Sequence, residues 1–306
     1  NEYMETSDVK VKLLKKRKLP SRDVYICVFD NEEWKPVFYG KARLGSATFK
    51  GMGRNVTYMV CGYDGRNSEL IPVSLPFYLD GFGNVTYIGD GETTGTVSFT
   101  LRRKYPMFQH VMLAQSTLHG GMVLGSDEKM FLNPDTVCVF PEWSLTSGIV
   151  KVKQTSLHRY WRFISDRRSM SDMAELYFYD KSGVRVDMMA DTDSLNNMFD
   201  GDPLTYYTAR RGAASGILDA GHPIHLDHVS YIRRGDGNAI VPGDRYRVSW
   251  WNGYGWVTHC EMTAADVELE IKDIPAGRLY FVEGLTRGEQ NRIFTFENGA
   301  ERPVWR

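Results

Sequence analysis

The sequence predicts an all-β protein with more than one domain. Short runs rich in Val, Ile, Thr, Phe and Tyr recur at the spacing of a β-sandwich, and several of them alternate apolar with polar side chains. Turn formers such as Asp80-Gly81-Phe82-Gly83-Asn84 separate the runs, and no amphipathic helical window of useful length interrupts them. A chain of 306 residues, 42% of them hydrophobic, is long enough for two or three packed cores.

Residues 1–104 are predicted to form an antiparallel, immunoglobulin-like β-sandwich. The first strand is Val9-Lys10-Val11-Lys12-Leu13, in which every second side chain is apolar, as a strand with one wet face requires. The basic run Lys15-Lys16-Arg17-Lys18 after it is interpreted as the solvated end of a hairpin, and a site for a polyanion is the less favoured interpretation. The charged run Arg102–Pro106 ends the module. The remaining predicted strands are Val24–Phe29, Trp34–Tyr39, Ala47–Phe49, Val56–Val60, Pro76–Leu79 and Val97–Leu101.

Residues 105–183 and 184–306 are predicted to form two further β modules. The first of them ends in the strands Tyr160–Ile164 and Met173–Tyr179, which are joined by a polar loop. The second ends in the strands Leu279–Val282 and Arg292–Glu297. Each ending consists of a hydrophobic strand, a polar loop that contains Arg, and an aromatic strand with an acid, so the two modules form a weak internal repeat.

Three motifs stand out in these modules: the turn Asp200-Gly201-Asp202-Pro203-Leu204-Thr205 and the strand segments Asp219-Ala220-Gly221 and Ala174-Glu175-Leu176. Together they resemble the discoidin family, also called coagulation-factor type C or galactose-binding-like domains. The resemblance implies two tandem jelly rolls after the sandwich, an abbreviated one at 105–183 and a fuller one at 184–306. In its order of modules, the whole chain resembles the C-terminal non-catalytic region of bacterial transglutaminase-like proteins that carry such a tail, with phrases that include Leu101–Pro106 and Leu285–Thr295.

The resemblance implies that the chain is a carbohydrate- or surface-binding accessory region of a larger secreted bacterial protein. A transglutaminase- or protease-like catalytic domain would then lie upstream of Asn1, and the location would be extracytoplasmic, that is secreted, periplasmic or at the cell surface. The family's catalytic thiolate is activated at a helix start, whereas every Cys here lies in a strand-like run, so we expect no enzyme activity from this chain. A structural spacer and protein-interaction module without a small-molecule ligand is the alternative.

Calcium is the metal that the resemblance implies. Discoidin-like domains often hold a structural Ca²⁺ in the turn that matches Asp200, Asp202 and Thr205, with a further carboxylate from the closing strand. Glu297 occupies the closing strand of the same predicted module, whereas Glu175 belongs to the preceding one. The alternative is that Asp200 and Asp202 cap the turn by accepting backbone N–H bonds.

A glycan is the ligand predicted for the aromatic and polar residues of the last module. Sugars are held by aromatic faces together with planar polar side chains, and this region supplies both. Trp250 and Trp251 are adjacent in one strand and face opposite sides, so at least one of them is expected in the core. Burial of the aromatic residues between modules would favour the spacer, and a concave loop surface that exposes them would favour glycan binding. The candidate glycan-binding residues are Tyr206, Tyr207, Arg233, Arg234, Asp236, Asn238, Trp251 and Trp256.

Charge and cysteine usage exclude several classes of partner. The formal net charge of −1 and a pI near 6.7 give no general electrostatic attraction to nucleic acid or to an anionic membrane. No run approaches the roughly 18 apolar residues that a membrane-spanning helix needs.

The cysteines are interpreted as buried free thiols, with Cys27 and Cys61 the one pair to test for a bridge. His222, His225 and His228 are interpreted as solvated, because a spacing of three in an extended chain does not align them.

Overall fold

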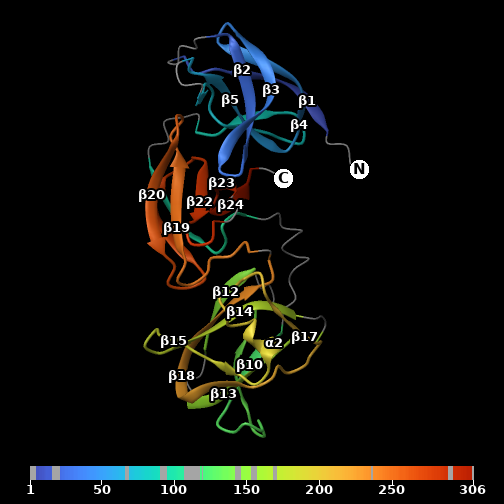
Figure 1. The fold of residues 1–306 in the computed structure, drawn as a ribbon, viewed down its shortest axis with the longest axis vertical. Helices are drawn as coiled ribbons and strands as arrows, with labels where there is room; N and C mark the ends of the chain where they lie inside the picture. Colours follow the sequence, from blue (N-terminus) through green and yellow to red (C-terminus); the bar gives the residue numbers. More distant parts are fainter. Residues whose placement is uncertain are drawn as a thin grey trace.

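The structure, a computed structural model, describes residues 5–15, 21–65, 69–89, 95–106, 118, 120–141, 146–152, 157–167, 171–235, 237–288 and 292–304. These residues are nearly all in β-strands and the turns between them, as the sequence predicts, with a short helix α2 (Asp193–Asn196). The strands form three units that follow one another along the long axis of the molecule (Figure 1). We call them the N-terminal unit, the C-terminal sandwich and the inserted unit, in their order from top to bottom of the figure.

The N-terminal unit contains β1 to β8 in the sheet order β1-β4-β3-β2-β5-β7-β8, with β6 paired to β5. In β1 the buried Val9 and Val11 alternate with the exposed Lys10 and Lys12, which confirms the predicted first strand. The buried faces of the strands share one core. The strands are β1 (Thr6–Lys12), β2 (Asp23–Asp30), β3 (Glu33–Arg43), β4 (Ser46–Gly53), β5 (Val56–Tyr63), β6 (Leu70–Pro72), β7 (Phe77–Leu79) and β8 (Val85–Tyr87).

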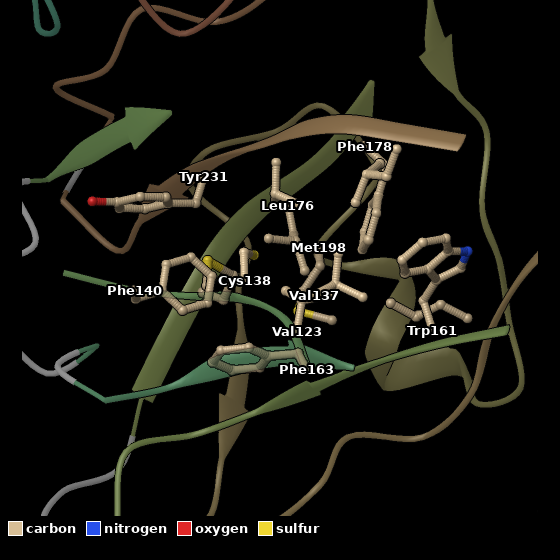
Figure 2. Close-up of a cluster of buried hydrophobic side chains, with 14 of the residues drawn as sticks. Val123, Val137, Cys138, Phe140, Trp161, Phe163, Leu176, Phe178, Met198 and Tyr231 are labelled. Atoms are coloured by element: carbon tan, nitrogen blue, oxygen red, sulfur yellow. The ribbon is translucent and has the colours of Figure 1, made fainter. Parts of the chain in front are cut away.

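The inserted unit contains β10 to β18 and α2 around a single core, which includes Trp161, Phe163, Phe178 and Tyr231 (Figure 2). Its strands are β10 (Met122–Ser126), β11 (Asp135–Val139), β12 (Ser147–Lys151), β13 (Leu157–Ile164), β14 (Ser171–Asp180), β15 (Arg185–Val186), β16 (Met189–Ala190), β17 (Tyr207–Ala209) and β18 (Leu218–Arg233). The long strand β18 joins the two halves of the unit, because its first half pairs with β13 and β16 and its second half with β12 and β14.

The C-terminal sandwich packs a five-stranded sheet, in the order β20-β19-β22-β23-β24, against the pair β21-β9. Apolar side chains of both sheets meet in one core, where the ring of Phe99 stacks on that of Phe296 with centroids 4.6 Å apart. The strands are β9 (Thr96–Leu101), β19 (Arg245–Trp251), β20 (Trp256–Thr263), β21 (Leu269–Pro275), β22 (Tyr280–Gly284), β23 (Ile293–Glu297) and β24 (Ala300–Pro303).

The sheets cross both predicted module boundaries, so the modules 1–104, 105–183 and 184–306 do not coincide with the three units. β9 lies before residue 104 but pairs with β21 of the C-terminal sandwich. β14 and β18 lie on either side of the boundary at 183 but pair along most of β14. The reason is physical, because an alternating pattern such as that of β9 identifies a strand without identifying its partner. The inserted unit therefore interrupts the C-terminal sandwich between its first strand and its other strands.

All four cysteines are free, which agrees with their interpretation as thiols: Cys27, Cys61 and Cys138 are buried and Cys260 is partly buried. Within the described part of the chain, no helix has the length and apolar character needed to cross a bilayer. The three histidines at 222, 225 and 228 all lie in β18, where the first two are exposed and His228 is mostly buried.

Candidate functional site

The turn between α2 and β17 carries the three residues predicted to bind calcium. The Asp200 carboxylate accepts the backbone N–H of Asp202 at 2.8 Å and the hydroxyl of Thr205 at 2.7 Å. The Asp202 carboxylate accepts the backbone N–H of Leu204 at 3.1 Å. Gly201 has a φ of 73°, a backbone conformation that glycine adopts without strain. The hydrogen bonds of the capping interpretation are therefore present in this turn.

Glu175 lies in the same unit as this turn, and not in a separate module as the sequence boundaries implied. Its side chain, on β14, is 0% exposed, and neither carboxylate oxygen has a hydrogen-bond partner among the described residues. The pKa of Glu175 is raised to about 8, mainly by burial and also by the neighbouring Asp200 carboxylate, while the positive charge of Arg287 opposes both effects. A buried carboxyl with these neighbours is neutral over much of the physiological pH range.

Arg287, which follows β22 in the C-terminal sandwich, reaches across to this turn. Its guanidinium donates to the Asp244 carboxylate at 2.5 Å and to the backbone carbonyl oxygen of Gly201 at 2.6 Å. Another of its nitrogens lies 4.0 Å from Asp202 Oδ1. A single cation therefore faces carboxylates from both the sandwich and the inserted unit. We call Glu175, Asp200, Asp202, Asp244 and Arg287 the inter-unit charge cluster.

Lys104 lies beside this cluster on the segment that leads into the inserted unit. It is buried, and the pKa of its ammonium group is lowered to about 8, mainly by burial and also by the Arg287 charge, while the Asp244 carboxylate opposes the shift. Perturbed titrations of this kind gather at functional sites and also at structural ion-pair networks. The cluster spans an interface between two units, and that position is the one expected of a structural network.

The calcium prediction can be compared with the donors that are present. Calcium takes six to eight oxygen ligands, and the buried Glu175 carboxylate next to Asp200 has the right chemistry for one side of such a site. Within the described ranges, however, no group of three or more His, Cys, Asp or Glu side chains is arranged to hold a metal ion. Arg287 already supplies positive charge to the turn. Calcium at Asp200, Asp202 and Thr205 therefore stays a prediction from the resemblance.

The predicted glycan-binding residues do not form one exposed surface. The Tyr206 ring is partly buried and lies under the guanidinium of Arg234, 4.4 Å from its ring centroid. Tyr207 packs against the core of the inserted unit, and Arg233 is almost fully buried. Of these four residues, Arg234 alone has an exposed side chain, and it faces Asp172 at 3.8 Å. Asp236 lies outside the described residues.

Asn238 has a structural role between two segments of the backbone. Its side-chain oxygen accepts the backbone N–H of Tyr105 at 3.1 Å, and its side-chain nitrogen donates to the Tyr105 carbonyl oxygen at 2.9 Å. Tyr105 lies on the segment that enters the inserted unit, and Asn238 lies on the segment that leaves it. The amide therefore ties the two connections together and is buried in doing so.

Trp251 and Trp256 lie between the C-terminal sandwich and the N-terminal unit. Trp251 is only 5% exposed, and its ring centroid lies 5.9 Å from that of Trp34 on β3. Trp256 contacts Phe29 of β2 at 5.6 Å, and Phe29 also contacts Phe281 of β22 at 5.1 Å. Apolar residues of both units, among them Cys27, Met59, Leu279 and Ile293, complete this inter-unit cluster. Both tryptophans therefore lie at the interface between the two units.

His228 forms a second polar link between the inserted unit and the sandwich. Its Nδ1 lies 2.7 Å from the neighbouring Asp227 carboxylate, and its Nε2 lies 3.0 Å from that of Asp266, just after β20. The imidazole ring stacks on Tyr179 with centroids 4.5 Å apart. The ring therefore lies within hydrogen-bond distance of a carboxylate from each unit. The sequence contained no signal for this link beyond the Asp-His dipeptide, because Asp266 is remote in the chain.

Comparison with known proteins adds no family to this description. A scan against protein-family models finds no match for the chain. No curated protein matches its sequence.

Proposed function

We propose that this chain is a non-catalytic structural module, a rigid connector that holds its units in a fixed order and positions the protein of which it forms a part. The observation that carries the proposal is the packing of the buried Trp251 and the partly buried Trp256 between two units, the arrangement expected of a spacer. A glycan-binding surface would leave such residues accessible. Following the resemblance, the domain that it would position is a transglutaminase- or protease-like enzyme domain, outside the cytoplasm.

Rigidity is further supported by the chemistry of the contacts between units. Interfaces between independently moving domains are polar and modest in size, whereas large apolar contacts couple domains. The contact with the N-terminal unit is aromatic on both sides, through Phe29 and Trp34 on one side and Trp251 and Phe281 on the other. The contact with the inserted unit combines an apolar cluster around Tyr177 and Ile232 with the inter-unit charge cluster.

The experiment that tests this proposal compares Phe29→Ala with Phe82→Ala. Both substitutions remove a phenyl ring from the N-terminal unit, but Phe29 contacts the C-terminal sandwich whereas Phe82 is 89% exposed. We expect the Phe29 variant to show a larger maximum dimension in small-angle X-ray scattering and a separate calorimetric transition for the N-terminal unit. Wild-type protein that already melts in independent transitions, or a Phe29 variant that matches the Phe82 control, would contradict the proposal.

Carbohydrate binding remains the second candidate, on residues that the sequence did not suggest. Tyr39 on β3 is 48% exposed, and its ring lies 5.9 Å from that of Tyr25 on β2, which in turn contacts Tyr63 on β5 at 5.3 Å. The Tyr39 hydroxyl donates to the Asp23 carboxylate at 2.7 Å. Exposed rings beside a carboxylate suit a sugar ring and its hydroxyls. Affinity electrophoresis in glycan-containing gels tests carbohydrate binding. Retention of the protein is expected to fall for Tyr39→Ala and not for Phe82→Ala. Absence of retention of the wild type on any glycan would count against carbohydrate binding.

A further inference from the structure

A groove at one end of the N-terminal unit combines lysine side chains with an apolar floor. It has a volume of about 610 Å³ and is lined by Lys10, Lys12 and Lys15 together with Leu13, Leu44 and Val73. A smaller cavity of about 230 Å³ shares the segment from Lys12 to Lys15 with it. No Asp or Glu is among the described residues that line either cavity. The sequence suggested a basic run here and interpreted it as a solvated hairpin end.

The segment that carries these lysines is fixed by hydrogen bonds. Lys12 donates its backbone N–H to the Tyr87 hydroxyl at 2.7 Å. The backbone N–H groups of Leu13 and Leu14 donate to the carbonyl oxygens of Gly45 and Val73, at 2.9 and 2.8 Å. The groove therefore has a defined shape before any ligand arrives, which reduces the entropic cost of binding.

The three lysines are available to an anion. Their side chains are exposed, and none of them forms an ion pair with a described residue. The chain as a whole has a formal net charge of −1, so the positive charge at this groove is a local feature and not a general property of the surface. Three ammonium groups without carboxylate neighbours complement a negatively charged group.

Leu44 is the second unusual feature of this groove. It is 97% exposed, and with a φ of 51° it occupies a left-handed backbone position in the two-residue turn between β3 and β4. Asn, Asp or Gly is preferred at such a position, and a leucine there gains nothing from burial in this chain. This exposed leucine lines the groove beside the three lysines.

We propose that this groove binds an anionic amphiphile, a single alkyl chain that ends in a carboxylate or a phosphate group. The head group lies against Lys10, Lys12 and Lys15, and the alkyl chain lies along Leu13 and Leu44. Leucine has no flat face on which a sugar or a nucleobase could stack, so an alkyl chain fits the floor better than a glycan or a nucleic acid does. This ligand class is independent of the connector function proposed above.

Isothermal titration calorimetry of the whole chain with decanoate, butyrate and inorganic phosphate, all below micellar concentrations, tests the proposal. We expect decanoate to bind saturably at one site and at least about tenfold more tightly than butyrate or phosphate, because each buried methylene contributes about threefold to fourfold in affinity. Decanoate binding that is no tighter than butyrate binding would overturn the proposal.

Matched variants separate the groove from general charge. Lys12→Glu is expected to weaken decanoate binding about tenfold, whereas Lys50→Glu, the same change on an exposed residue of β4 outside the groove, leaves it unchanged. Leu44→Ser, at a fully exposed position, is expected to weaken decanoate binding and not butyrate binding. Equal effects of the two Lys→Glu changes would overturn the proposal. If Lys12→Glu alters the melting temperature, Lys10→Gln takes its place.

A final experiment distinguishes binding of a free amphiphile from binding to a membrane surface. Sedimentation is measured with vesicles of phosphatidylcholine and with vesicles that also contain phosphatidylglycerol. Binding to the anionic vesicles without saturable binding of decanoate would assign the groove to surface docking and overturn the free-ligand proposal. Saturable decanoate binding that the Leu44 and Lys12 substitutions weaken would support it.

Discussion

Glu175→Gln is expected to stabilise the protein at alkaline pH and to have little effect at acidic pH. The pKa of Glu175 is raised from 4.5 to about 8, mainly because the carboxyl is buried and also because the Asp200 carboxylate is its neighbour. Below its ordinary pKa the group is neutral in the folded and unfolded states alike. As the pH rises, the unfolded chain releases the proton first, so stability is lost progressively until the pH passes about 8. The loss amounts to about 5 kcal/mol, from a shift of about 3.5 pKa units at about 1.4 kcal/mol each.

The assay is urea unfolding of wild type and Glu175→Gln at about pH 5 and about pH 8.5. The two proteins are expected to differ little at the lower pH, and the variant is expected to be the more stable by a few kcal/mol at the higher one. Glu297→Gln is the control, because that carboxylate is half exposed in the C-terminal sandwich. A difference between wild type and Glu175→Gln that is the same at both pH values would refute the reasoning from burial.

The same variant tests calcium. If a calcium ion binds at Asp200, Asp202 and Thr205 with Glu175 as a further ligand, millimolar Ca²⁺ will stabilise the wild type at pH 8.5, since it binds the ionised carboxylate. The Glu175→Gln variant would then respond less. A melting midpoint of the wild type that is the same with Ca²⁺ and with chelator would contradict the calcium prediction.

Two further substitutions test the links between the inserted unit and the sandwich. Arg287→Ala removes the hydrogen bonds to Asp244 and Gly201, so we expect urea unfolding to show a free energy of unfolding lower by about 1.5 to 3 kcal/mol. The control is Arg302→Ala, an exposed change that is expected to cost less than about 0.5 kcal/mol. Equal losses in the two variants would contradict the prediction. His228→Gln removes the ring that joins Asp227 and Asp266 and is expected to cost about 1 to 2 kcal/mol by the same measurement. His222→Gln, an exposed change on the same strand, is expected to cost nothing measurable, and a similar loss there would argue against the link.

The strands could be predicted from the sequence because each carries its own signal. β1, β5 and β9 alternate or are continuously apolar within six to eight residues, a length typical of strands. The units could not be predicted in the same way. β9 finds its partner β21 more than 160 residues later, and no local pattern encodes that pairing.

In the candidate site too, local contacts could be predicted from the sequence and contacts between remote segments could not. The hydrogen bonds within the Asp200 turn are local, and the capping interpretation describes them. The neighbours of that turn come from elsewhere: Glu175 from β14 and Arg287 from the loop after β22. The tryptophans were expected either on a loop surface or between modules, and their position depended on where the N-terminal unit packs, which no stretch of the sandwich sequence specifies.

The inserted unit is connected to the sandwich in a way that limits its rotation. The polar links through Arg287 and His228 are therefore needed for stability and not for orientation. A unit that is joined by one linker can swing about it, whereas this unit is joined by two, which run through Tyr105 and Asn238. The paired amide hydrogen bonds hold the two segments together, and Ser147 at the start of β12 donates to the Arg102 carbonyl oxygen at 2.7 Å on the incoming segment. Two linkers that are hydrogen-bonded to each other restrict the orientation of the unit, so loss of Arg287 or His228 should lower the free energy of unfolding without changing the shape of the molecule. The N-terminal unit has no such second connection in the described chain, and its orientation depends on the aromatic contacts of Phe29 and Trp251.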